Sequence, residues 1–240
     1  LCEKPLASNS TEAADMIRAA KENGVLLMEA MKTTFLPIFK AIQASLPKIG
    51  KVRRYFASYC QYSSRYDAYR DGTVLNAFKP EFSNGSLMDL GIYCVYPLVV
   101  LFGEPQAVKA NGVMLDSGVD GEGSLILTYE DFEAVIMHSK ISNSYIPSEI
   151  QGEEGSILID HISTPGKVEI RYRDGRAEEV KAEESFESMY YEAEEFIRLV
   201  KSGKQESTVN THNHSYITSR ILEEARKQMG LVYPADLEKI

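Results

Sequence analysis

The first thirty residues have the apolar pattern of an α/β unit. Apolar side chains recur at helical spacing over residues 13–20, and the polar residues 9–11 offer capping side chains, with Glu12 completing a capping box. Gly24 supplies a helix stop, because glycine tolerates the left-handed conformation that follows many helices. The wholly apolar run 25–28 then predicts a short buried strand. A helix followed at once by such a strand is typical of a parallel sheet.

The next seventy residues alternate between helical and extended patterns. Residues 37–46 predict a second helix, and residues 52–62 predict a long strand. The stretch 63–83 is polar and aromatic, which predicts a long loop of the kind that is usually functional or mobile. Residues 86–102 predict an apolar helix.

From residue 106 to residue 180 the pattern predicts a meander of antiparallel strands. Short apolar runs alternate there with turn residues, and Asp174-Gly175 is a strong hairpin signal. The runs are 125–129, 134–137, 146–151, 156–160 and 168–172. Two helices, over residues 190–200 and 216–229, follow. The fold class is therefore α+β: an α/β remnant, then a large open antiparallel sheet with helices on one face.

Some of the predicted strands are apolar on both faces. Residues 125–127 and 135–137 are continuous apolar runs. Helices on one side of a sheet leave its other apolar face to be covered by something else. We therefore expect a homodimer formed through the open face of the sheet.

Composition narrows the class of protein. The chain has 240 residues, of which 44% are hydrophobic and 25% are charged, as in ordinary globular proteins. Its formal charge of −9 repels phosphate backbones, so we expect no nucleic-acid partner. The three cysteines lack a C-x-x-C spacing, which favours a reducing, cytoplasmic location. The longest apolar run, 92–102, is too short for a membrane span, so no membrane partner is expected.

Two histidines near the last helix, His212 and His214, have no cysteine or glutamate that completes a metal-binding set. We expect them to be structural, with Asn213 capping the last helix, and we expect no metal site.

Two short motifs contain candidate chemistry. Glu3-Lys4-Pro5 opens the chain, although a lysine before a proline is in most sequences a solvated turn. Asp89 and Tyr93 lie four residues apart and therefore share one face of a helix. From these residues alone, Asp89 and Tyr93 either belong to a site or satisfy each other inside a buried helix.

The order of the motifs resembles that of the Gfo/Idh/MocA oxidoreductase family. The residues that support this are Glu3-Lys4-Pro5, then residues 28–31 (Met-Glu-Ala-Met), then residues 85–93 (Gly-Ser-Leu-Met-Asp-Leu-Gly-Ile-Tyr). The similarity runs from Leu1 to about Arg226. Many members have histidine where this chain has Tyr93. A tyrosine at this position resembles the glucose–fructose oxidoreductase and dihydrodiol and xylose dehydrogenase-like branch.

The resemblance implies a division of the chain. Residues 1–30 would be the C-terminal remnant of a dinucleotide-binding Rossmann domain, residues 31–226 a substrate and dimerisation domain of α+β type, and residues 227–240 a C-terminal tail. No G-x-G-x-x-G fingerprint occurs in this sequence. We therefore expect the pyrophosphate and ribose ligands to lie upstream of Leu1, so that this chain alone is inactive.

The resemblance also implies an activity: an NAD- or NADP-dependent dehydrogenase transferring hydride between nicotinamide and a sugar, polyol or diol. It implies Tyr93 as the acid–base group, Lys4 as the partner that lowers the pKa of Tyr93 and orients substrate, and Asp89 as a ligand of a substrate hydroxyl. Glu3, Lys4 and Pro5 would also contact the cofactor.

The sequence departs from the family's pattern at Thr34, where an arginine is common, and at Tyr96, where a carboxylate or histidine is common. The alternative hypothesis is a non-catalytic dimerisation or ligand-sensing module.

Overall fold

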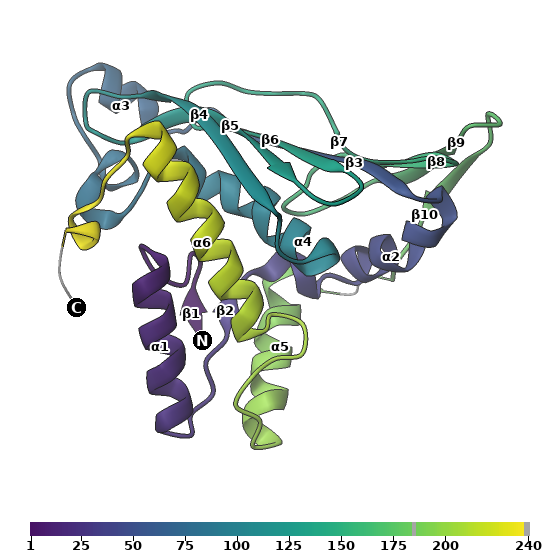
Figure 1. Cartoon of the computed structure of the whole chain (residues 1–240), viewed down its shortest axis with the longest axis horizontal. Coiled ribbons are helices and arrows are strands. Elements are labelled where there is room, and N and C mark those ends of the chain that lie inside the picture. The colour runs from purple at the N-terminus through teal and green to yellow at the C-terminus, as the bar shows by residue number, and fades with distance from the viewer. Residues whose placement is uncertain (184–185, 238–240) are drawn as a thin grey trace.

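The computed structural model describes residues 1–183 and 186–237. The chain opens with a parallel β–α–β unit, formed by β1 (Cys2–Glu3), α1 (Ser10–Glu22) and β2 (Glu29–Ala30) (Figure 1). The predicted cap is confirmed, because the Asn9 side chain accepts a hydrogen bond of 2.9 Å from the Glu12 N–H.

The apolar run 25–28 is not a strand, contrary to the prediction. Val25 is 53% exposed, and the strand consists only of Glu29–Ala30. The reason is that β1 offers only Cys2–Glu3 for pairing, while Leu27 donates its N–H to Gln205 O in a neighbouring loop.

The rest of the chain is organised around an eight-stranded sheet. Its strands are β3 (Val52–Cys60), β4 (Ala107–Met114), β5 (Asp120–Thr128), β6 (Glu133–Ser139), β7 (Ser148–Gly152), β8 (Gly155–Ile159), β9 (Val168–Tyr172) and β10 (Ala177–Val180). Their spatial order is β10-β9-β8-β7-β3-β6-β5-β4.

The sheet is mixed, which corrects the expectation of a purely antiparallel sheet. β3 pairs with β6 in parallel, whereas its other neighbour, β7, is antiparallel. The cause is the long helical connection after β3. It carries the chain to the far edge at β4, and the hairpins β4–β5–β6 then bring β6 back beside β3 in the same direction.

The helices cover one face of this sheet, as predicted. The covering helices are α2 (Pro37–Ser45), α4 (Ile92–Phe102) and α6 (His212–Met229), and α5 (Ser188–Lys201) extends away from the sheet (Figure 1). α6 packs on β4 and α4 packs on β3, whereas α5 contacts the 3-10 turn Lys32–Phe35 (Figure 1). The other face is open. By register it presents a row of apolar side chains: Phe56, Ile126, Val135, Met137 and Leu158.

The segment 63–83, predicted as a long loop, contains the short helix α3 (Tyr66–Arg70) and two 3-10 turns, Asn76–Phe78 and Pro80–Phe82. The rings of Tyr66 and Tyr69 stack with their centroids 5.7 Å apart, and both pack on Phe78. These aromatic contacts order a segment whose polarity pointed to a loop.

The segment Pro80–Phe102 is long and apolar enough to cross a membrane by length and composition, but 67% of its apolar window is buried inside the structure. Burial of this kind is also found in the core helices of globular proteins. Here the segment supplies a large part of the central core, including Leu87, Ile92 and Tyr96.

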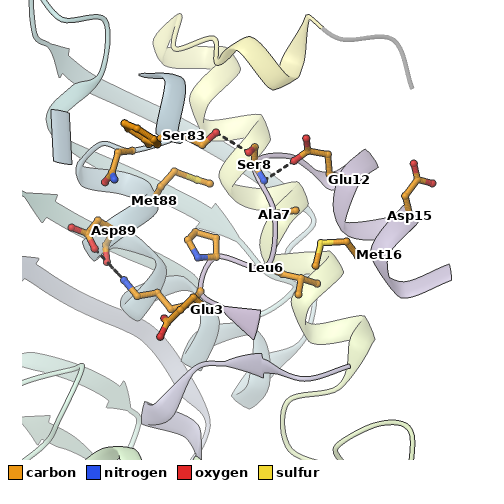
Figure 2. A pocket seen from close by; sticks show the side chains of 14 residues that line it. Glu3, Leu6, Ala7, Ser8, Glu12, Asp15, Met16, Ser83, Met88 and Asp89 are labelled. Atoms are coloured by element: carbon orange, nitrogen blue, oxygen red, sulfur yellow. Dashed lines mark hydrogen bonds and ion pairs between the residues drawn. The ribbon is translucent and has the colours of Figure 1, made fainter. Parts of the chain in front are cut away.

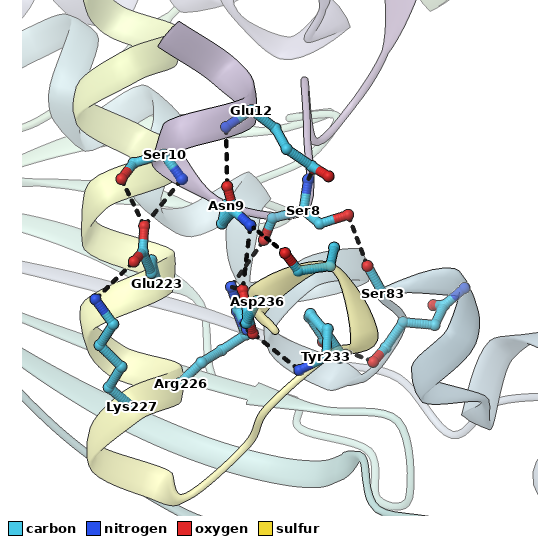
Figure 3. Close-up of polar contacts among 12 residues, drawn as sticks. Ser8, Asn9, Ser10, Glu12, Ser83, Glu223, Arg226, Lys227, Tyr233 and Asp236 are labelled. Carbon is cyan, nitrogen blue, oxygen red and sulfur yellow. Dashed lines mark hydrogen bonds and ion pairs between the residues drawn. The ribbon is translucent and has the colours of Figure 1, made fainter. Parts of the chain in front are cut away.

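The last helix and the residues after it hold the start of the chain in place. α6 begins at His212 with Thr211, not the predicted Asn213, as its cap, and it runs through the predicted boundary at residue 227. The buried Arg226 guanidinium donates to Asp236 Oδ2 at 2.6 Å and to Ser8 O at 2.8 Å (Figure 3). The tail thus folds back onto the loop that follows Lys4. Residues 238–240 of the predicted tail lie outside the described residues.

Candidate active site

A cleft of about 650 Å³ opens between the start of the chain and the turns before α4. One wall is the loop from Glu3 to Ser8 with the first turns of α1, and the other is formed by residues 82–84 with Met88 and Asp89 (Figure 2). The predicted cofactor-binding residues, Glu3, Lys4 and Pro5, all line this cleft.

The structure brings the three predicted catalytic residues together. Lys4 Nζ donates to Asp89 O at 2.7 Å and to Asp89 Oδ1 at 3.1 Å (Figure 2). The same ammonium lies 4.5 Å from the centroid of the Tyr93 ring. An ammonium has three N–H donors, so Lys4 keeps one for a bound molecule. The Lys4 side chain is only 12% exposed, so solvent has limited access to this donor.

Asp89 lies in a π-helical turn, Leu87–Gly91, which precedes α4. The sequence predicted a regular helix here. The wider turn presents both the main-chain carbonyl and the carboxylate of Asp89 to Lys4. Turns of this kind occur often at functional sites.

Close packing holds this turn. The Leu87 N–H donates to the buried Asp120 Oδ2 at 2.7 Å. A side chain on Gly85 would meet Asp120 Oδ1 at 2.1 Å, and one on Gly91 would meet Leu87 Cδ1 at 2.9 Å. Burial raises the pKa of Asp120 to about 6. The turn therefore rests on a buried carboxyl with no room for bulkier residues at Gly85.

A second lysine, not identified from the sequence, contacts Asp89. Lys140 Nζ lies 2.8 Å from Asp89 Oδ2, and its side chain is only 3% exposed. Burial alone would raise the pKa of Asp89, but Lys140 and Lys4 outweigh it and hold that pKa below its usual value. Lys140 follows β6, fifty-one residues after Asp89 in the chain, so no local pattern could have linked them.

Tyr93 differs from its predicted state. Burial, together with Tyr59 and Asp89, raises the pKa of Tyr93, whereas a lowered pKa was expected. The cause is geometric, because the Lys4 ammonium sits over the ring face. Among the described residues, the Tyr93 hydroxyl makes no hydrogen bond, so the alternative in which Tyr93 and Asp89 satisfy each other is not what the structure shows. The ring packs edge-on against Tyr59, with centroids 5.6 Å apart.

Two further buried carboxyls near the site were not anticipated. Glu29, 2% exposed, accepts the Leu6 N–H at 2.9 Å and so fixes the loop that follows Lys4. Burial raises its pKa to about 7. Glu192 on α5 is 5% exposed, and burial and the nearby Glu3 raise its pKa to about 7. Both residues occur in ordinary helical or strand contexts that carry no local signal of burial.

The groups around the cleft suit the nicotinamide end of a dinucleotide better than its phosphates. Glu12 and Asp15 line the outer part of the cleft, where their charges oppose a pyrophosphate. Lys4, with one free donor, lies at the inner end beside Asp89. Within residues 1–183 and 186–237, no group of three or more His, Cys, Asp or Glu side chains is placed to hold a metal ion.

Comparison with known proteins identifies the family. Residues 45–158 match the model of the GFO/IDH/MocA C-terminal domain. The chain is 66% identical over 236 residues to scyllo-inositol 2-dehydrogenase (NADP(+)) of Bacillus subtilis, a match that spans 98% of this chain and 72% of that protein. The chain belongs to the Gfo/Idh/MocA family. It is a dehydrogenase.

More distant relatives and solved structures agree with this assignment. The trans-1,2-dihydrobenzene-1,2-diol dehydrogenase of Danio rerio is 33% identical over 98% of this chain and 72% of its own length. The crystal structure of aldose–aldose oxidoreductase from Caulobacter crescentus superposes with a TM-score of 0.81 at 19% identity, covering 95% of this chain and 68% of that one. At that identity the likeness shows the fold: helices with a large mixed sheet.

Proposed function

We propose that this protein is an NADP-dependent dehydrogenase that oxidises a ring hydroxyl of a polyol, with scyllo-inositol as the first substrate to test. The contact of Lys4 with both Asp89 and the Tyr93 ring is the observation that carries the proposal. It places a cation, a carboxylate and a phenol around one end of the cleft. The relative at 66% identity is named for this substrate and cofactor, which supports both choices.

The protein's own residues would handle the proton and the hydroxyls. A bound NADP⁺ would supply the hydride acceptor for the carbinol carbon, and residues of this chain would have to take up the hydroxyl proton. Tyr93, in its deprotonated form, would accept this proton, and the free N–H of Lys4 would stabilise the negative charge that develops on the substrate oxygen. Asp89, whose side chain is 40% exposed, would bind a neighbouring hydroxyl. The alcohol would thereby lose one hydride and one proton and become a ketone.

We further propose that the β1–α1–β2 unit is the last part of a Rossmann sheet, with the domain boundary near residue 30. β2 pairs with one edge of β1, and the described residues supply no strand that pairs with the other edge of β1. A parallel strand added there would extend the sheet and bring phosphate ligands to the mouth of the cleft. Calorimetric titration of NADP⁺ into this chain and into the full gene product tests the idea. Equal affinity would contradict it.

The open face of the sheet supports a homodimer, and the cysteine pattern supports a cytoplasmic location. Both remain proposals.

Initial rates of nicotinamide reduction test the proposed activity. Scyllo-inositol should be oxidised with NADP⁺ faster than with NAD⁺, and faster than trans-1,2-dihydrobenzene-1,2-diol with either cofactor. The absence of any activity with polyols, aldoses and diols in a cofactor-binding preparation would contradict the proposal.

A further inference from the structure

We propose that Lys140 is a positioning residue of the active site, which holds the Asp89 carboxylate in the ionised state and in the orientation that binds Lys4. The inference rests on the proposed function of Lys4 and Asp89 and deepens it. Its basis is the line of three charges formed by Lys140, Asp89 and Lys4, in which each carboxylate oxygen pairs with a different ammonium.

Hydrogen-bond capacity separates the roles of the two lysines. Lys140 Nζ lies 2.8 Å from Asp89 Oδ2, 3.0 Å from Ala77 O and 3.3 Å from Asn84 Oδ1. These three acceptors use all three of its donors. With a side chain 3% exposed, Lys140 has neither a free donor nor access to a bound molecule. Lys4 has both, so Lys140 acts through Asp89.

The charges explain what this arrangement achieves. Burying a carboxylate costs desolvation free energy unless an opposite charge pairs with it. Lys4 alone would not pair with Asp89 continuously, because Lys4 also binds substrate. Lys140 remains in place whatever Lys4 binds, because its other two acceptors belong to the turns before α4. Asp89 can therefore hold Lys4 throughout a catalytic cycle.

The other ionisable groups around Asp89 do not supply this function. Tyr93, on α4, is protonated because burial raises its pKa. Asp120, behind the π-helical turn, carries the same sign of charge as Asp89. The ionised state of Asp89 thus depends on the two lysines, with Lys140 the larger contributor.

The test is the pH dependence of kcat/KM for scyllo-inositol oxidation with NADP⁺ in the full gene product. The acid limb is the low-pH break at which protonation of Asp89 steepens the fall already caused by protonation of Tyr93. In Lys140→Met this acid limb should move to higher pH by about one unit, because Asp89 loses a nearby opposite charge. At neutral pH kcat should fall on the order of tenfold to a hundredfold through misplacement of Lys4, while the KM for NADP⁺ stays within about twofold. Lys51→Met, which removes the charge of an exposed ion pair with Asp131, is the matched control and should change neither.

Two comparisons keep the result interpretable. If Lys140→Met does not fold, Lys140→Ala assayed with added ethylammonium should recover activity and the wild-type acid limb, whereas ethanol should recover neither. An acid limb that stays in place in Lys140→Met, or recovery by ethanol as well, would overturn the inference. Loss of activity in Lys4→Met and Asp89→Asn alongside that result would leave the proposed function standing. Full activity in those two variants would refute the proposed function itself.

Discussion

The Lys4 ammonium lies over the face of the Tyr93 ring, 4.5 Å from its centroid, and donates its hydrogen bonds among the described residues to Asp89 and not to the Tyr93 hydroxyl. A cation in this position is attracted by the ring quadrupole and orders the side chain. It does not contact the oxygen on which a phenolate charge is concentrated. The phenol therefore stays protonated at neutral pH, consistent with the raised pKa of Tyr93. This geometry suits proton donation during carbonyl reduction and makes alcohol oxidation dependent on pH.

Oxidation should become faster as the pH rises. Because the pKa of Tyr93 is raised, the phenolate is a minor species at neutral pH, and kcat/KM for scyllo-inositol oxidation should increase about tenfold per pH unit over the neutral to mildly alkaline range. Rate–pH profiles in the oxidation direction measure this. In Tyr93→Phe the alkaline rise should disappear and kcat should fall by roughly 10²-fold to 10⁴-fold. Activity within a few-fold of wild type would rule out the acid–base role.

Glu29 should make the fold less stable at neutral pH than in mild acid. Its pKa is 4.5 when unperturbed and about 7 in the folded protein, mainly through burial. The folded state binds the proton more tightly, so this contribution to stability is complete below pH 4.5 and is lost as the pH rises through 7. Urea unfolding of wild type and Glu29→Gln at pH 5 and pH 8 tests the sign. The fall in unfolding free energy between these pH values should be smaller in Glu29→Gln by roughly 3 kcal/mol. An unchanged difference would show that Glu29 is not protonated at pH 5.

Gly85 should tolerate no side chain. Its φ is 147°, and an added Cβ would lie 2.1 Å from Asp120 Oδ1. Gly85→Ala should therefore lower the unfolding free energy by about 2 kcal/mol or more and should also reduce activity, because Asp120 anchors the turn that carries Asp89. Gly72→Ala is the matched control, since Gly72 also has a positive φ of 89° but no atom within 4 Å of an added Cβ. Equal losses of unfolding free energy in both variants would attribute the effect to backbone conformation and not to the contact with Asp120.

The open face of the sheet should be a dimer interface. Ile126 is 45% exposed, at the β5 end of this apolar row. Light scattering of this chain should give twice its 26.9 kDa mass, and Ile126→Glu should give the monomer. Val25→Glu, at a site of 53% exposure remote from the sheet, should stay dimeric. A monomeric wild type would refute the interface.

The fold could be predicted as far as local patterns reach. Asn9 capped its helix as expected, the α+β order was confirmed, and the five predicted strand runs correspond to β5, β6, β7, β8 and β9, whereas β4 and β10 were not among those runs. The parallel pairing of β3 with β6 was missed, because apolar alternation is the same in parallel and antiparallel neighbours. The π-helical turn at Asp89 was missed for a related reason, since it depends on the tertiary anchor that Asp120 supplies.

The order of the motifs predicted that Lys4, Asp89 and Tyr93 share one site, and in the structure Lys4 contacts both of the others. The charge balance around them could not be read from the sequence. Lys140 comes from another part of the chain and contacts Asp89 only because β6 ends beside the π-helical turn. The prediction of a lowered pKa for Tyr93 was wrong for the same reason. The pKa depends on whether the Lys4 ammonium contacts the face of the Tyr93 ring or its hydroxyl.

The role of Lys4 is tested most directly by the steady-state rate of NADPH formation from scyllo-inositol by the full gene product, compared between wild type and Lys4→Met with Lys51→Met as control. We expect measurable turnover in wild type and Lys51→Met, and a loss on the order of 10³-fold in kcat/KM in Lys4→Met, because the free donor beside Asp89 and Tyr93 is gone. Wild-type turnover in Lys4→Met would contradict the proposed site.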